Sequence, residues 1–129
     1  MTIPFKREPE SGLIIVSIEI DDKFELKMFF DMGATHTTID SNALYLLGYD
    51  LKDNIGTVQI ETANGVIETE VFEVGSFASL GQRKDKFQIQ FYDVLAHGIF
   101  SDYNGLLGLD FLEGTNFCID TNLNTITLN

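Results

Sequence analysis

Residues 29–40 of this 129-residue chain read FFDMGATHTTID. Two aromatic residues run into Asp31, and Met32 and Gly33 follow it. Because glycine permits tight turns and close backbone approach, the pattern predicts a strand that ends at Asp31 and a loop that presents its carboxylate. An Asp that only turns a β-loop has the same three-residue pattern, since Asp and Gly both favour turns. The stretch alone leaves both interpretations of Asp31 open.

The segments on both sides of this loop alternate apolar and polar residues with the period of two that is typical of strands. Residues 16–20 and 24–30 predict a hairpin that turns at residues 21–23 and leads directly into Asp31. The Asn64-Gly65 dipeptide is a strong hairpin signal between two further strands. The remaining predicted strands are residues 57–61, 66–74, 87–91, 117–119 and 125–128. The sequence therefore predicts an all-β fold of short strands.

Helical signals are few. Asp40 or Ser41 can cap a short helix over residues 42–47, which Gly48 ends. Residues 105–112 are apolar and punctuated by glycine, which favours a core strand that turns into a helical stub. We therefore expect one or two short helices in an otherwise β-rich chain.

The ends and the charged segments define the expected domain organisation. Residues 1–12 are polar and hold both prolines, so they predict an irregular N-terminal arm. Residues 82–86 carry much of the positive charge and predict a solvated loop. No change of composition suggests a second unit, so residues 13–129 are predicted to form a single domain.

Composition excludes several classes of function. The formal net charge of −12 argues against binding nucleic acid, which needs clustered Lys and Arg, and against binding an anionic membrane. The first residues lack the apolar core of a signal peptide, and no apolar run approaches the ~18 residues of a membrane span. Cys118 is the only cysteine and lies in an apolar run, so we expect a buried thiol. These features predict a cytoplasmic protein.

The order and spacing of three stretches resemble the retropepsin-like aspartic peptidases, the single-domain family that contains the retroviral proteases. The residues that match the active-site pattern of that family are Phe29, Phe30, Asp31, Gly33, Ala34, Thr37 and Ile39. Those that match its second pattern are Leu106, Leu107, Gly108, Phe111 and Leu112. Between them, residues 62–65 look much like the tip of the family's hairpin flap. The resemblance implies an acid-protease fold, a closed β-barrel with a β-hairpin flap.

The resemblance also implies a mechanism. Each retropepsin-like subunit supplies one catalytic Asp, here Asp31, and a homodimer brings two together across a two-fold axis. Two carboxylates in contact share a proton; the ionised one activates a water, and the protonated one donates to the developing oxyanion. The implied reaction is hydrolysis of a peptide or protein substrate, with no metal and no other cofactor.

Further roles carry over by position. The resemblance implies that peptide is bound beside Asp31, beneath the flap and against an apolar wall. The residues in these positions are Gly33, Ala34, Thr35, His36, Ala63, Asn64, Gly65, Val66 and Leu106. For His36, a surface imidazole beside the loop is the alternative interpretation.

Met32 departs from the family pattern. The family has Thr or Ser here, whose hydroxyl hydrogen-bonds across the dimer axis, and Met32 has no donor and a larger apolar side chain. The consequences left open are a weak dimer, a monomer, a differently packed dimer or an inactive homologue; an engineered substitution is also conceivable. The rival hypothesis is therefore a retropepsin-like module that binds peptides or proteins, or serves in dimerisation, without cutting.

Overall fold

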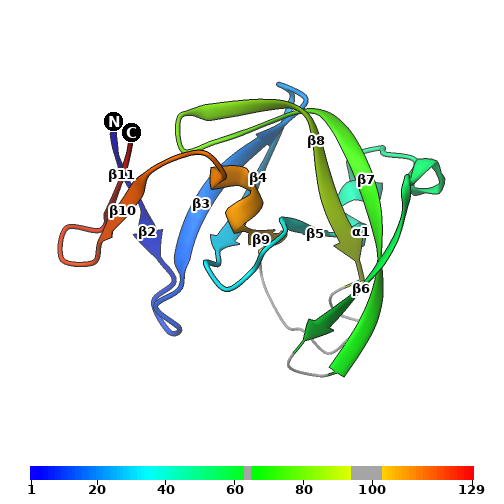
Figure 1. The fold of residues 1–129 in the computed structure, drawn as a ribbon, viewed down its shortest axis with the longest axis horizontal. Helices are drawn as coiled ribbons and strands as arrows, with labels where there is room; N and C mark the ends of the chain where they lie inside the picture. Colours follow the sequence, from blue (N-terminus) through cyan, green and yellow to red (C-terminus); the bar gives the residue numbers. More distant parts are fainter. Residues whose placement is uncertain (63–64, 94–102) are drawn as a thin grey trace.

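The structure is a computed structural model, and it describes residues 1–62, 65–93 and 103–129 (Figure 1). The strands are β1 (Thr2–Pro4), β2 (Lys6–Arg7), β3 (Ile14–Ile20), β4 (Phe24–Phe30), β5 (Thr38–Asp40), β6 (Gly56–Thr62), β7 (Gly65–Ser79), β8 (Gln82–Tyr92), β9 (Gly105–Leu107), β10 (Phe117–Asp120) and β11 (Thr125–Leu128). The helical elements are α1 (Ser41–Leu46) and the 3₁₀ turns η1 (Leu51–Asp53) and η2 (Leu109–Leu112). The predicted all-β class is confirmed.

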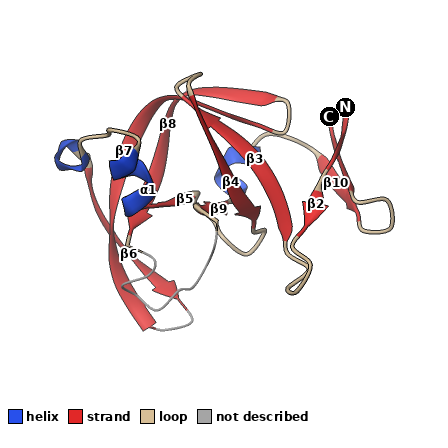
Figure 2. Cartoon of the chain, turned by 180° about the vertical axis from the view of Figure 1, so that it is seen from behind, coloured by secondary structure: helices blue, strands red, loops and turns tan. Residues whose placement is uncertain are grey.

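The larger sheet wraps around the core. Its strand order is β2-β3-β4-β9-β5-β8-β7-β6, and β3 also pairs with β7. Hydrogen-bonded pairing therefore runs from β3 through β4, β9, β5, β8 and β7 and returns to β3. Figure 2 shows how strongly β7 and β8 curve to make this connection. The apolar faces of these strands can thus be buried together on the inside.

Alternation along the strands explains what the core contains. On β3 and β4, Ile18, Ile20 and Met28 are at most 1% exposed, and polar residues occupy the positions between them. Phe77 and Phe111 are fully buried, and their ring centroids lie 5.3 Å apart. This contact joins β7 to η2. The core therefore holds η2, the element that follows β9, in a fixed place.

The two ends of the chain form a second, smaller sheet with the order β1-β11-β10 (Figure 1). Thr2 is opposite Thr127 in the register, and the Phe5 N–H donates to the Asn124 carbonyl at 2.9 Å. The prediction of an irregular segment at residues 1–12 is therefore wrong where β1 and β2 lie. The pairing partners of β1 are more than a hundred positions away, so local sequence carries no trace of them.

Two other expectations are corrected. Residues 82–86 are not a solvated loop but the first part of β8, paired with the end of β7 around the turn at Leu80 and Gly81. Cys118 is exposed, not buried. It lies on β10, where Phe117 and Ile119 are turned inward and the residues between and after them are exposed. Because side chains alternate between the two faces of a strand, the Cys118 thiol is on the exposed face of β10.

The helix predicted at residues 42–47 is found at Ser41–Leu46, and Gly48 follows its end with φ +96°. Asp40 occupies the N-cap position, but its side chain makes no capping hydrogen bond. No helix within the described ranges is long and apolar enough to cross a membrane.

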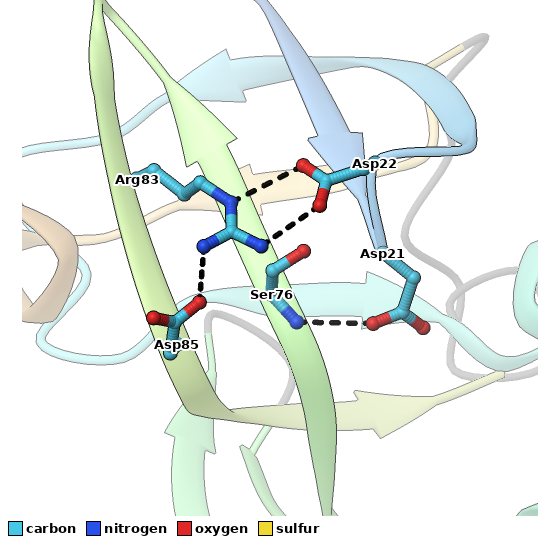
Figure 3. A network of polar contacts seen from close by, with 5 residues as sticks. All are labelled: Asp21, Asp22, Ser76, Arg83 and Asp85. Carbon is cyan, nitrogen blue, oxygen red and sulfur yellow. Dashed lines mark hydrogen bonds and ion pairs between the residues drawn. The ribbon is translucent and has the colours of Figure 1, made fainter.

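A cluster of polar contacts fixes the β3–β4 turn against β7 and β8 (Figure 3). Asp21 Oδ1 accepts from the Ser76 N–H at 3.0 Å, and Asp21 Oδ2 accepts from the Tyr49 hydroxyl. Burial and this carboxylate raise the pKa of the Tyr49 phenol. Arg83 pairs with Asp22 at 2.8 Å and also with Asp85. The hairpin that delivers β4 to the candidate site is therefore held at its far end.

Candidate active site

Asp31 follows the last residue of β4. Next to it, β9 lies between β4 and β5, parallel to β4 and antiparallel to β5. Phe30 is opposite Leu107 in the register, and the Asp31 N–H donates to the Leu107 carbonyl at 3.0 Å. The sheet ladder therefore extends one residue beyond β4 and fixes the backbone of Asp31.

The carboxylate of Asp31 is held in a tight turn. Its Oδ1 accepts from the Gly33 N–H at 2.8 Å, and its carbonyl accepts from the Ala34 N–H at 3.1 Å. Within the described part of the chain, Oδ2 has no hydrogen-bond donor. The side chain is half-buried. The turn expected from the Asp-X-Gly pattern is present, and it leaves one carboxylate oxygen open for another group.

The loop after Asp31 is tied to η2 by backbone and side-chain bonds. The Ala34 carbonyl accepts from the Leu109 N–H at 2.9 Å. Asp110 accepts from the Thr37 hydroxyl at 2.7 Å and from the Thr37 N–H, which lies 3.0 Å from both carboxylate oxygens. The Thr37 hydroxyl oxygen in turn accepts from the Gly108 N–H at 3.1 Å. The loop therefore has little freedom to move relative to η2.

Gly108 is required by the close approach of the loop. A Cβ at this position would lie 2.7 Å from the carbonyl carbon of His36 and 2.9 Å from the Ala34 oxygen. Both are backbone atoms, so neither can rotate away. Gly108 thus lets the strand end of β9 pass directly beneath the loop that carries Asp31.

Five of the ten predicted site residues, Asp31 and residues 33–36, lie on this loop, and Leu106 lies on β9 beside it. Gly33, Thr35 and His36 are exposed and Ala34 is half-buried, and Thr35 Oγ1 lies 3.0 Å from His36 Nδ1. Leu106 is half-buried on β9, opposite Phe29 on one side and Thr38 on the other. Its position in the sheet next to the strand that leads to Asp31 fits an apolar wall.

The predicted flap residues lie on a separate hairpin. β6 and β7 pair along their length, ending with Thr62 opposite Gly65, and Val66 is 62% exposed. Ala63 and Asn64, predicted to form its tip, lie outside the described residues. Figure 1 shows this hairpin extending from the sheet on the side of the molecule toward which the loop after β4 also points. The described residues give no contact between the hairpin and Asp31.

Met32 is 53% exposed. Leu109, at the start of η2, is 37% exposed. The Leu109 N–H is bonded to the Ala34 carbonyl, so the backbone of the loop that carries Met32 is tied to the start of η2.

Asp110 is the residue whose part in the site sequence reasoning missed. Asp110 belongs to the apolar stretch 105–112, where an acid between two apolar residues is unusual in a core segment. That anomaly is the signal that could have identified it. Thr37 was matched to the family pattern, but its bond to Asp110 was not foreseen.

Comparison with known proteins gives the family. A family model described as aspartyl protease matches residues 16–111, which include both the Asp31 loop and most of the segment around Gly108. The chain belongs to the aspartyl protease family. Among curated proteins, no sequence matches it significantly.

A solved structure supports the fold of this aspartyl protease family member. The crystal structure of a retropepsin-like aspartic protease from Rickettsia conorii superimposes with a TM-score of 0.73 at 22% sequence identity. The match covers 100% of this chain and 90% of the other. The chain thus has a retropepsin-like fold, and the resemblance noted from the sequence is confirmed.

The part of this aspartyl protease chain that the structure describes has no cluster of metal ligands. No three His, Cys, Asp or Glu side chains there are grouped so that they could hold an ion.

Proposed function

We propose that this chain is an aspartic endopeptidase that works as a homodimer, with one Asp31 carboxylate from each copy. The proposal rests on the way the backbone and the carboxylate of Asp31 are held. Its backbone is fixed by the sheet, its Oδ1 is oriented by Gly33, and its Oδ2 has no donor among the described residues. A single carboxylate of this kind is half of the pair that aspartic peptidases need, and a second copy related by a two-fold axis supplies the other half.

The pair would act as a coupled acid and base. Two carboxylates in contact cannot both ionise easily, so they hold one proton between them and titrate as a unit. The ionised member takes a proton from a water, which attacks the carbonyl carbon of the peptide bond. The protonated member donates to the carbonyl oxygen as negative charge develops there. The proton gained from water then passes to the leaving amine, and the peptide is cut in two.

The substrate would be an extended peptide bound across the Asp31 loop. On this proposal Gly33 presents its carbonyl to the peptide backbone, Ala34, Thr35 and His36 line the site, and Leu106 forms an apolar wall. The β6–β7 hairpin acts as the flap, with Ala63, Asn64, Gly65 and Val66 at or near its tip. The exposure of Val66 and of the loop residues supports these roles, because both are accessible to a ligand.

A comparison of the native chain with Asp31→Asn tests this function. Both proteins are incubated with a peptide library at several pH values, and cleavage is followed by mass spectrometry. We expect cleavage by the native chain and its loss in Asp31→Asn, because the amide cannot act as a base. The matched control is Asp53→Asn, an exposed acid on η1. A cut that survives in Asp31→Asn counts against the proposal.

A second candidate is a non-catalytic module that binds peptides or proteins. Met32 favours it, because its exposed apolar side chain replaces a hydroxyl next to Asp31. A binding module has no need of the carboxylate, yet Asp31 and the bonds that orient it are present. A folded, dimeric native chain that cuts no peptide at any pH would favour this second candidate.

We also propose a cytoplasmic location. Cys118 is the chain's only cysteine and is exposed, and a thiol of this kind persists best in a reducing compartment. Cell fractionation followed by detection of the native chain tests this location, and recovery from an oxidising compartment would contradict it.

A further inference from the structure

The position of Met32 follows from the proposed dimer, on which this inference rests. If two Asp31 carboxylates meet across a two-fold axis, the next residue in each chain is close to that axis, since consecutive Cα atoms are only about 3.8 Å apart. Met32 is that residue, and 53% of its surface is exposed in the single chain. In such a dimer the exposed Met32 side chain would therefore lie near the other copy.

Leu109 begins the turn that is bonded to the loop carrying Met32. Its N–H bonds the Ala34 carbonyl at 2.9 Å, two positions after Met32, and its side chain is 37% exposed. Asp110, the next residue, holds Thr37 through both carboxylate oxygens. The two apolar side chains thus belong to a loop and a turn whose backbones are bonded to each other, so the backbone needs little ordering when a partner arrives.

Charge and polarity favour contact between two copies here. Each copy carries a formal charge of −12, which opposes association over most of the surface. Residues 32–35 and 108–109 contain no ionisable group, and the ionisable residues that flank them are Asp31, His36 and Asp110. A single exposed apolar side chain is ordinary on a protein surface. Met32, however, is next to Asp31, which meets Asp31 of the second copy in the proposed dimer. A methionine thioether packs adaptably against itself and against leucine.

We propose that Met32 and Leu109 of both copies form an apolar contact at the two-fold axis, and that this packing holds the two Asp31 loops together. In the family pattern, Thr or Ser at this position forms a hydrogen bond across the dimer axis. Here the apolar contact takes the place of that bond. Met32 is then a positioning residue that acts on the catalytic pair through the dimer. A hydroxyl introduced at position 32 weakens the contact, because it removes apolar surface that the dimer buries.

The dimer dissociation constant of a Met32 series tests the contact by sedimentation equilibrium. Met32→Leu keeps the apolar volume, and we expect a change of less than about threefold. Met32→Ala and Met32→Thr lose apolar burial in both copies, and we expect dissociation constants roughly 10- to 100-fold higher. The matched control is Leu123→Thr in the turn between β10 and β11, where the side chain is 69% exposed; it leaves the dimer unchanged.

Met32→Thr distinguishes the proposal from the opposite hypothesis. In that hypothesis the dimer is held by hydrogen bonds between hydroxyl groups at position 32, and Met32 weakens it. A Met32→Thr dimer as tight as the native dimer, or tighter, overturns the proposal, and so does a native chain that is monomeric at every concentration. Circular dichroism confirms that the variants are folded, which their exposed position favours.

The outcome for the contact is distinguishable from the outcome for the proposed function. Cleavage that depends on Asp31, together with a Met32→Thr dimer of native strength, overturns the contact and leaves the peptidase standing. A native dimer that cuts nothing, but that Met32→Ala and Met32→Thr weaken, supports the contact and overturns the peptidase.

Discussion

The Thr37 hydroxyl donates to Asp110 Oδ1 at 2.7 Å, and the Thr37 N–H reaches both oxygens of the same carboxylate. Thr37 is fully buried, and the two residues are 73 positions apart in the chain. This bond joins the loop that carries Asp31 to the turn that follows β9. The site is therefore held by η2 as well as by the sheet.

Removal of the Asp110 carboxylate should destabilise the fold and loosen the loop. Asp110→Ala leaves the buried hydroxyl and N–H of Thr37 without their acceptor, which costs about 1–3 kcal/mol. Urea unfolding measures the loss in the free energy of unfolding. Glu113→Ala, an exposed acid just after η2, is the control and should change it by less than ~0.5 kcal/mol. An equal free energy of unfolding for the two variants would show that the bond between Thr37 and Asp110 does not stabilise the fold.

A methyl group at Gly108 should displace the Asp31 loop. In Gly108→Ala the new Cβ would meet the backbone of His36 and Ala34 at 2.7–2.9 Å, so we expect a loss of roughly 1–3 kcal/mol in the free energy of unfolding. Gly33→Ala is the comparison, because its Cβ would lie 3.2 Å from a single side-chain oxygen of Asp31. Thermal unfolding of both variants checks the difference. A Gly108→Ala protein as stable as Gly33→Ala would contradict the close approach.

The ion pair of Asp22 and Arg83 should stabilise the β3–β4 turn in a pH-dependent way. The hydrogen bond from Arg83 lowers the pKa of the Asp22 carboxyl in the folded chain. Stability from this pair is therefore present above the unfolded pKa of Asp and is lost as the pH falls through the lower folded value. We expect Asp22→Asn to lower the melting temperature slightly at about pH 7 and not at about pH 2. A difference that persists unchanged in acid would contradict this.

Association of two acidic copies should depend on salt and pH. A dimer carries twice the charge of one copy, −24 at neutral pH. Salt screens this repulsion, and acid removes it by protonating carboxylates. We therefore expect tighter dimerisation, and higher activity, below neutral pH, and a tighter dimer at about 0.5 M than at about 0.05 M salt. Sedimentation that shows the same dissociation constant under all these conditions would count against the prediction.

Much of the fold could be predicted because its signals are local. The alternation of residues 16–20 and 24–30 predicts β3 and β4, and their order predicts that Asp31 ends a strand. The errors arise where a structure depends on partners far away in the chain. β1 is only three residues long and contains proline, and its pairing with β11 makes it a strand. β8 begins at Gln82 because β7 offers it a partner, although the sequence there is charged.

The candidate site could be predicted only in part, because only some of its contacts join residues that are close in the sequence. Asp31 and Gly33 are adjacent, so their turn is visible in the sequence. The contribution of Asp110 depends on the fold placing it beneath Thr37, and no local pattern reports this. The prediction of a buried Cys118 is wrong because its apolar neighbours favour burial, whereas the alternation on β10 turns the thiol outward.

Mixing experiments test the shared Asp31 pair most directly. A fixed amount of the native chain is titrated with Asp31→Asn while the rate of peptide cleavage is followed. If each active unit needs one Asp31 from each of two copies, the variant draws native chains into inactive heterodimers, and the rate should fall steadily as the variant is added. A rate that stays constant while heterodimers form would contradict the account, because a single Asp31 would then be sufficient.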